Sequence, residues 1–276
     1  MQQSKIIILG NGFLANRLKE ENGWTICSDR IESYRDLEAI VRKHVPKVIV
    51  CAIGFTGASN VDDCEKDIDR TIQANTVVPI YLAELSFRFP DVHILDISTG
   101  CMFADPDREY DDDDIGDYDA LFYSRTKIYA EEMLKYPARQ GRKISICRIR
   151  LILDWKSSAK NALDKLIRYK TIIDIPNSLT YVPTMCRAFD FIIANKVYGV
   201  INIVNDGTLR YPKLLDEYKK YVPSYSYEIT TLKKLGIDRT NVRLLPRRLA
   251  ELGFKNETVD EVVRDCVKRY VETARK

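Results

Sequence analysis

The sequence predicts an α/β fold in which a parallel, doubly wound sheet is joined to a smaller second lobe. Three observations lead to this prediction. Short apolar runs alternate with stretches of helical character over residues 1–150, a glycine-rich turn follows the first run, and the alternation breaks off at Leu151. Alternating strands and helices at this pitch are typical of parallel sheets, because each crossover between parallel strands needs a helix.

The first apolar run, Lys5–Leu9, is rich in β-branched residues and predicts a buried strand. The turn after it has the order Gly-x-Gly-x-x-Ala and leads into a helix, the context in which this pattern binds a dinucleotide. Gly10 permits the turn, Gly12 lets a pyrophosphate approach the backbone, and Ala15 lets the helix pack closely on the strand. An ordinary turn is the alternative, but a position so near the amino terminus argues against chance. We expect the cofactor to contact Gly10, Asn11, Gly12, Phe13 and Leu14.

The remaining elements follow in chain order. Further strands are expected at Trp24–Cys27, Pro46–Ala52, Val92–Ile97, Lys143–Ile149 and Gly199–Val204. Helices are expected at Tyr34–Lys43, Cys64–Phe87 (with a kink at Pro79), Ser124–Tyr136, Arg187–Lys196 and Val259–Tyr270, the last one amphipathic. The pattern therefore predicts a Rossmann-type cofactor domain over 1–150, to which 184–206 return, and a substrate-binding lobe formed by 151–183 and 207–276.

Composition narrows the class of protein. A net charge of +3 over 276 residues argues against a dedicated nucleic-acid binder. Without an apolar run of about 18 residues we expect no membrane span, and residues 1–9 leave no room for a signal peptide. The seven cysteines form no Cys-x-x-Cys pair, which indicates reduced thiols in a cytoplasmic enzyme. The two histidines, His44 and His93, have no metal-ligand neighbours along the sequence, so no metal site is expected.

A tyrosine and a lysine four residues apart predict reductase chemistry. Tyr123 and Lys127 would share one face of a helix, where the ammonium favours the phenolate and lowers the phenol pKa. Such a phenol can give a proton to a carbonyl oxygen as hydride reaches the carbon. This spacing is common by chance, and the glycine turn upstream is what makes it credible. Ser98–Cys101 would lie just past the end of a strand, where parallel sheets bind ligands.

The end of the second strand predicts which dinucleotide is bound. An acidic residue there would bind the ribose hydroxyls of NAD. Here Ser28 and Arg30 could instead bind a 2′-phosphate, which favours NADPH. Asp29 keeps NAD open, and Arg30 could also be an ordinary solvated residue.

Small residues follow the third strand, and an acidic segment lies further along the chain. We expect Ala52, Gly54 and Thr56 to line the cofactor site, and Asn75 either to lend it an amide or to be a plain polar residue of a helix. Segment 105–119 carries four consecutive aspartates but lacks the glycine and glutamate of a calcium loop, so a solvated, flexible loop is expected.

Several stretches, taken together, resemble a known family. The sequence is similar over essentially its full length to the extended short-chain dehydrogenases/reductases that act on nucleotide sugars. Within them it looks most like the bifunctional 3,5-epimerase/4-reductases that form UDP-L-rhamnose. One departure is the glycine turn, which is shorter than usual in the family and ends in Ala15 instead of a third glycine. The resemblance is carried by Gly54–Glu65, Ser98–Phe103, Phe122–Lys127, Asn161–Lys165, Ile167–Tyr169 and Asp174–Ser178.

The resemblance implies a role for each matching residue. Thr99, Tyr123 and Lys127 match the catalytic residues of carbonyl reduction. Cys101 and Lys165 match the acid/base pair of epimerisation, although a free cysteine is more often a small buried hydrophobe. Sugar dehydratases place an Asp-Glu pair where this chain has Gly100-Cys101, so dehydration is disfavoured. Substrate contacts are expected at Cys101, Asn177, Arg168 and Arg247, with Arg248 a further candidate for the diphosphate and surface solvation the alternative for each arginine.

The expected function is therefore NADPH-dependent conversion of UDP-4-keto-6-deoxy-glucose to UDP-L-rhamnose. A separate 4,6-dehydratase would supply the keto sugar. Two alternatives stay open: a monofunctional dTDP- or UDP-4-dehydrorhamnose reductase, and a non-catalytic NADP-binding subunit similar to the regulatory subunit of methionine adenosyltransferase. The sequence also leaves open uridine against thymidine in the substrate, and whether the chain forms a homodimer.

Overall fold

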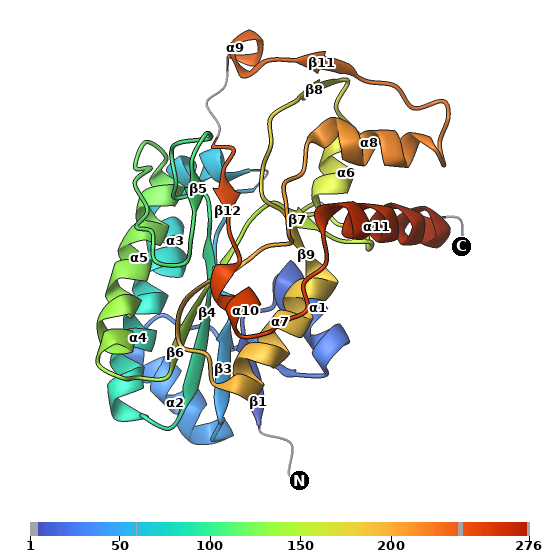
Figure 1. The fold of residues 1–276 in the computed structure, drawn as a ribbon. Coiled ribbons are helices and arrows are strands. Elements are labelled where there is room, and N and C mark those ends of the chain that lie inside the picture. Colours follow the sequence, from blue (N-terminus) through green and yellow to red (C-terminus); the bar gives the residue numbers. More distant parts are fainter. Residues whose placement is uncertain (1–4, 59, 237–239, 275–276) are drawn as a thin grey trace. The chain divides into compact units, whose positions relative to one another are not determined.

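The computed structural model describes residues 5–58, 60–236 and 240–274, and the chain divides into two compact units (Figure 1). The first unit comprises Met1–Met102, Ile115–Arg148 and Phe189–Ile201, and the second comprises Phe103–Asp114, Ile149–Ala188 and Asn202–Lys276. These bounds differ from the expected domains mainly at Phe103–Asp114, which groups with the second unit instead of the cofactor domain. Ser59, part of one resembling stretch, lies outside the described residues.

The first unit holds the elements that were predicted from the alternating pattern. Its elements, some of which continue past the boundary with the second unit, are β1 (Ile6–Leu9), α1 (Phe13–Asn22), β2 (Thr25–Cys27), α2 (Tyr34–His44), β3 (Val48–Cys51), η1 (Val61–Lys66), α3 (Ile68–Ile72), η2 (Gln73–Val77), α4 (Val78–Arg88), β4 (His93–Thr99), α5 (Phe122–Arg139), β6 (Ile144–Ile149), α7 (Val182–Asn195) and β10 (Gly199–Ile203).

These strands form a six-stranded sheet in the order β10-β6-β4-β3-β1-β2. The pairs β1–β2, β1–β3 and β3–β4 are parallel, which confirms the predicted α/β fold with a parallel sheet. β2 lies on one side of β1, and the chain then crosses over β1 to form β3 on its other side. Strand order therefore reverses between β1 and β3, and in such sheets the carboxyl ends of the two strands at the reversal form a ligand crevice.

Burial explains why these short segments are strands. β3 and β4 are buried along their whole length, as expected of strands covered by helices on both faces. In Figure 1, α2, α4 and α5 line one face of the sheet and α1 lies on the other. The hydrophobic core on this side includes Ile7, Leu37, Ile49, Leu82 and Leu134, which come from β1, α2, β3, α4 and α5.

The helix predicted over Cys64–Phe87 is interrupted, but not by Pro79 alone. A 3₁₀ segment (η1) and the short α3 precede a π-helical turn, η2, and Pro79 lies in the first turn of α4. Proline is tolerated there because the first amide groups of a helix lack partners in any case. π-Helical turns are rare and are found frequently at functional sites.

The second unit has short strands and a separate core. Its elements are β5 (Glu109–Tyr110), β7 (Ile152–Leu153), α6 (Ala162–Leu166), β8 (Thr171–Ile173), β9 (Thr180–Tyr181), α8 (Tyr211–Lys219), β11 (Glu228–Thr230), α9 (Leu232–Leu235), β12 (Arg243–Leu244), α10 (Arg247–Glu251) and α11 (Val259–Ala274). The amphipathic α11 buries one face against α6 and α8 in this core. None of the helices in the described ranges combines the length and the hydropathy that crossing a membrane requires.

The acidic segment 105–119 is largely exposed, as expected of a solvated loop, but it also contains a short strand and a buried carboxylate that we did not predict. It contains β5, which pairs in parallel with β12 and so joins residues more than 130 positions apart. Asp112 is buried and accepts hydrogen bonds from the backbone amides of Asn202 (2.6 Å) and Arg248 (2.9 Å). The flanking carboxylates form ion pairs with arginines of the second unit, to which the part of the segment up to Asp114 belongs.

Candidate functional site

The glycine turn is shaped to receive an anion. Gly10 has a φ of +98°, and a Cβ at this position would lie 3.3 Å from the carbonyl of Ala52, so only glycine fits without strain. Gly12 is the N-cap of α1 and provides no side-chain cap, while a Cβ built on it meets nothing within 4 Å. The first amides of α1 are therefore open to a ligand at the positive end of the helix.

Two further residues support this turn. Asn16 donates from its side-chain amide nitrogen to the carbonyls of Asn11 (2.8 Å) and Gly12 (2.9 Å), and these two bonds stabilise the turn. Ala15 is completely buried, in agreement with its expected role in helix–strand packing. Sequence analysis did not identify Asn16, although an asparagine four residues after a glycine N-cap could have indicated it. Phe13 and Leu14, the other two residues of the expected contact set, open α1 directly after the turn.

The residues after β2 are exposed and interact with one another. Ser28 is exposed, and Arg30 is 87% exposed with its Nε 2.8 Å from Glu32. Both are accessible to a 2′-phosphate, and binding one would require Arg30 to exchange its partner. Contrary to our expectation for the histidines, His44 lies in a group with Cys27 and Asp29, because the end of α2 approaches the end of β2.

The loop after β3 is held by Asn75 of the π-helical turn. Asn75 is completely buried, accepts from the amide of Phe55 (2.8 Å) and donates to its carbonyl (2.9 Å). Its amide is therefore engaged with the backbone, and it positions the loop that carries Ala52, Gly54 and Thr56. A second donated bond of 3.4 Å, to Thr126, links this loop to α5, the helix that carries Tyr123 and Lys127.

The tyrosine and lysine lie on α5 and are both buried. The Nζ of Lys127 donates to the carbonyl of Ile97 at 2.9 Å, so β4 fixes the ammonium 30 residues away in sequence. Thr99 also belongs to β4, which runs two residues further than we predicted. Its Oγ1 accepts from the amide of Cys101 (3.1 Å), and Ser124 of α5 donates to the carbonyl of Cys101 (2.7 Å). Tyr123, Lys127, Thr99 and Cys101 are thus held by one set of contacts within the first unit.

One and two turns after Lys127, the same face of α5 carries a buried ion-pair network that we did not predict from the sequence. Glu131 pairs with Arg148 of β6 (Nε to Oε2, 3.0 Å) and with Lys135 (2.9 Å), and it accepts from Ser98 at 3.2 Å. Burial raises the pKa of the Glu131 carboxyl, but its bonds to Arg148 and Lys135 outweigh this effect and hold the pKa below its usual value. The spacing of Lys127, Glu131 and Lys135, four residues apart, was the available signal.

The remaining predicted site residues belong to the second unit. Lys165 is on α6, where burial, followed by the nearby charge of Lys160, lowers the pKa of its ammonium. Asn177 is buried, and its Oδ1 accepts from Arg150 (3.0 Å) and from the amide of Val242 (3.2 Å), so it stabilises the fold of this unit. Arg168 is exposed.

The two other arginine candidates are paired with the acidic segment. Arg247 lies 3.1 Å from Asp111, and Arg248 lies 3.0 Å from Asp113. Both can reach a diphosphate only by giving up these carboxylates.

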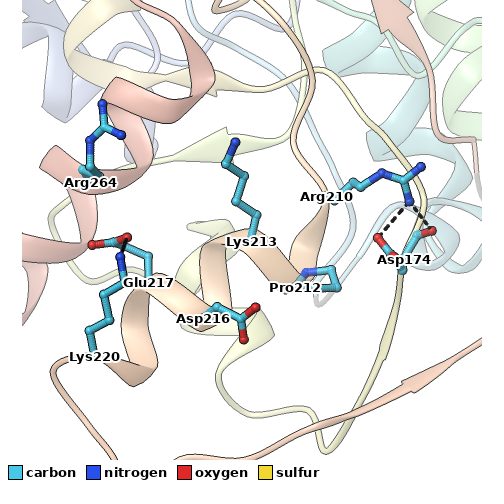
Figure 2. A pocket seen from close by; sticks show the side chains of 8 residues that line it. All are labelled: Asp174, Arg210, Pro212, Lys213, Asp216, Glu217, Lys220 and Arg264. Atoms are coloured by element: carbon cyan, nitrogen blue, oxygen red, sulfur yellow. Dashed lines mark hydrogen bonds and ion pairs between the residues drawn. The ribbon is translucent and has the colours of Figure 1, made fainter.

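None of the predicted site residues lines a hollow of about 480 Å³ in the second unit (Figure 2). Its lining is charged, and two ion pairs lie within it: Arg210 with Asp174 (3.0 Å) and Lys220 with Glu217 (2.6 Å). Lys213, also in the lining, pairs with Asp260 outside it. Figure 2 shows the Arg210–Asp174 pair closing one side of the hollow. With four cationic and three acidic side chains in the lining, its charges nearly balance.

Comparisons with known proteins identify the family and the fold of the chain. The model of the NAD dependent epimerase/dehydratase family matches residues 4–153. The chain is 27% identical to an Arabidopsis thaliana bifunctional dTDP-4-dehydrorhamnose 3,5-epimerase/dTDP-4-dehydrorhamnose reductase, over 87% of this chain and 81% of that protein. It is 28% identical to a trifunctional UDP-glucose 4,6-dehydratase/3,5-epimerase/reductase of the same plant, but it spans only 36% of that protein's length.

Solved structures share the fold over the whole chain. The UDP-rhamnose synthase of Acanthamoeba polyphaga mimivirus superposes with a TM-score of 0.88, covering 96% of this chain and 99% of that one at 21% identity. The dTDP-4-dehydrorhamnose reductase of Bacillus anthracis, in complex with NADP, gives 0.81 at 19% identity, covering 99% of this chain and 100% of that one.

Proposed function

Because the chain belongs to the NAD-dependent epimerase/dehydratase family, we propose that it converts UDP-4-keto-6-deoxy-glucose to UDP-L-rhamnose. The reaction consists of epimerisation at carbons 3 and 5 followed by reduction of the 4-keto group. NADPH supplies the hydride for the second step. The related plant proteins that are named for epimerase and reductase activities support the assignment.

Cys101 is the observation that carries the epimerase half of the proposal. All seven cysteines lie in the described ranges, and six of them are buried while Cys101 is partly exposed. Its backbone is tied on both sides, to Thr99 and to Ser124, which directs the thiol from a fixed position. A plain reductase needs no thiol there, whereas an epimerase needs a base that can reach a carbon acid.

The chemistry follows from the keto group of the substrate. A 4-keto group acidifies the hydrogens on carbons 3 and 5, because the carbanion left behind is delocalised as an enolate. The Cys101 thiolate removes one proton, and an acid on the opposite face returns one, so that the configuration inverts with no net change in protons. Lys165 is the proposed partner, and its lowered pKa brings its ammonium closer to the range where it can donate at neutral pH.

The reductase half rests on α5. Tyr123 donates its phenolic proton to the 4-oxygen as hydride reaches carbon 4, and Lys127, held by the Ile97 carbonyl, stabilises the resulting phenolate. Thr99 donates a hydrogen bond to the developing oxyanion. The first amides of α1 would hold the pyrophosphate of the dinucleotide, and Ser28 and Arg30 are proposed to select its 2′-phosphate.

The substrate is proposed to come from a 4,6-dehydratase. The trifunctional plant relatives are named for that activity in addition to epimerase and reductase activities, and this chain spans about a third of their length. Arg168, Arg247 and Asn177 are kept as proposed substrate contacts. Asn177 would act through its remaining amide hydrogens, since its oxygen is occupied by Arg150 and Val242.

The test separates epimerisation from reduction. UDP-4-keto-6-deoxy-glucose is supplied in deuterated water, and deuterium entering carbons 3 and 5 is followed by NMR. The wild-type protein should exchange both positions and yield a rhamnose-configured product when NADPH is present. Cys101→Ser should exchange at least about 100-fold more slowly, because an alkoxide is not accessible near neutral pH, yet it should still reduce a substrate epimerised by another enzyme.

Ser124→Ala is the matched control, since it removes the hydroxyl that bonds to the Cys101 carbonyl but leaves the thiol in place. It should retain exchange within about tenfold of the wild-type rate, the scale of losing one neutral hydrogen bond. Wild-type exchange rates in Cys101→Ser would mean that Cys101 is only a packed thiol and that the protein is a reductase needing a separate epimerase.

A further inference from the structure

We propose that Cys27, Asp29 and His44 form a binding site for a borderline-soft divalent cation such as Zn²⁺. Their ligand atoms, one thiol sulfur, one carboxylate oxygen and one imidazole nitrogen, all lie within 4.8 Å of one another. This inference goes beyond the proposed function, and it does not depend on whether the protein is an epimerase, a reductase or both.

The donor set matches zinc. Zn²⁺ takes cysteine sulfur, histidine nitrogen and carboxylate oxygen in tetrahedral sites, with bonds that place neighbouring ligand atoms about 3.3–3.7 Å apart. The Cys27 sulfur and an Asp29 oxygen are already 3.5 Å apart. Closing the remaining separations requires shifts of about 1 Å, which side-chain rotation can supply. A water molecule or an outside ligand would complete the fourth position.

Cys27 and His44 are held in place by a strand and a helix. Cys27 is the last residue of β2, and its carbonyl accepts from the amide of Gly10 at 3.2 Å. His44 is the last residue of α2, a helix fixed at its start by the capping box of Ser33 and Asp36. The carboxyl end of a helix carries partial negative charge, which favours a cation beside His44.

The local charges allow the site to form. Lys43 lies 3.7 Å from Asp29 and would oppose a cation, but its side chain is 69% exposed and can turn into solvent. In the structure the Cys27 thiol donates a hydrogen bond to Asp29, so it carries a proton that a cation has to displace. Coordination forms the Zn–S bond and releases that proton to the buffer, one per cation bound.

The position of the group has a consequence for the cofactor. Cys27 adjoins the glycine turn, and Asp29 and its neighbour Ser28 are where this fold receives the adenosine ribose. Zn²⁺ and the dinucleotide should therefore compete, with the metal holding Asp29 away from the ribose. This part of the inference rests on the proposed cofactor site, whereas the metal site itself does not.

Cobalt provides a direct test, because Co²⁺ bound to thiolate gives an intense charge-transfer absorption that oxygen and nitrogen ligands do not. The purified wild-type protein, stripped with a chelator, should gain this absorption on titration with Co²⁺, and Zn²⁺ should then displace the Co²⁺. One proton should be released per Zn²⁺ bound. Cys27→Ser should lose the absorption, and His44→Gln should weaken cation binding by more than about 100-fold, since even groups that only orient ligands account for about 10–100-fold.

Cys101→Ser is the control, because it removes the partly exposed thiol but leaves the group intact. It should bind Co²⁺ as the wild type does. If instead the absorption persists in Cys27→Ser, or disappears in Cys101→Ser, the proposed site is wrong. The competition is tested by repeating the titration with saturating NADP⁺, whose oxidised ring does not absorb in the region of the charge-transfer band. A shift to weaker metal binding is expected, and an unchanged isotherm would overturn the overlap with the cofactor. Circular dichroism of each variant shows whether it has folded. If Cys27→Ser does not fold, Asp29→Asn, a change at an exposed position, provides the second variant and should also weaken Co²⁺ binding.

Discussion

The residues proposed to be functional in the two units are held in place by different kinds of contact. In the first unit, Lys127 is buried and donates to a main-chain carbonyl, that of Ile97. In the second unit, Arg247 is 57% exposed and pairs with the carboxylate of Asp111. A carbonyl fixes the position of an ammonium but leaves its full charge available to a neighbouring phenol. A carboxylate neutralises its partner, and a substrate phosphate must replace it.

This difference indicates how each unit would respond to substrate. Helix α5, which carries the proposed catalytic pair, is held by contacts to the protein itself: Lys127 to the Ile97 carbonyl, Thr126 to Asn75 and Ser124 to the Cys101 carbonyl. Preorganised dipoles and charges need little rearrangement during reaction, which makes them effective in catalysis. The arginines of the second unit instead exchange one anion for another, so they are expected to affect binding more than turnover.

The largest effect is expected from Tyr123→Phe. Removing one hydroxyl deletes the proposed proton donor, so reduction of an epimerised 4-keto sugar should fall by about 10²–10⁴-fold. Dinucleotide binding, which rests on the glycine turn, should be nearly unchanged. Turnover is measured by NADPH absorbance, and Tyr129→Phe, an exposed position on the same helix, is the matched control. A Tyr123→Phe protein with wild-type turnover would exclude this tyrosine as the donor.

Glu131→Gln tests how much the buried network stabilises the first unit. The change leaves Arg148 buried without its counter-charge, which should cost about 3–5 kcal/mol of unfolding free energy at pH 7. Glu132→Gln, the adjacent exposed residue, should cost less than about 1 kcal/mol. Urea denaturation measures both.

The stabilisation that Glu131 provides is expected to depend on pH. The pKa of Glu131 is lower in the folded protein than the usual value of 4.5, so its stabilisation is fully present above about that pH. It is lost as the pH falls through the folded-state pKa. The gap between wild type and Glu131→Gln should therefore shrink below pH 4.5, and a gap that stays constant to lower pH would show that the network does not depend on this carboxylate.

A smaller effect is expected where an arginine has to change partners. Arg247→Gln should raise KM for the nucleotide sugar about tenfold and change kcat little, because it removes one charged contact to the diphosphate. Asp111→Asn should leave KM unchanged or lower it, since it frees Arg247. If both variants raise KM alike, Arg247 serves only to anchor the acidic segment.

The smallest effect is expected at Arg30, which is highly exposed and paired with Glu32. Arg30→Ala should weaken NADPH binding by only about three- to fivefold, because exposed charge pairs contribute little, and should leave NADH binding unchanged, as measured by fluorescence titration. Glu32→Gln, which releases Arg30, should strengthen NADPH binding slightly. Equal losses for both dinucleotides in Arg30→Ala would contradict the proposed contact to the 2′-phosphate.

The sequence by itself determined the parallel α/β fold, the glycine turn, and the placement of Tyr123 and Lys127 on one helix. These features depend on short-range patterns: β-branched runs, a turn that only glycine can adopt, and residues four apart on a helix. A resemblance within those same stretches singled out Cys101, and the structure leaves this thiol partly exposed while the other six are buried.

Only the tertiary structure decided which partners the charged residues take. It joined Arg247 to Asp111 and Asp112 to Asn202, turned Asn75 towards the backbone of Phe55, and brought His44 to Cys27 and Asp29. Apart from Cys27 and Asp29, the partners in these contacts lie between 15 and 136 positions apart in the chain. No periodicity or local motif encodes such contacts, because they arise when separate elements pack and each buried polar group must find a partner.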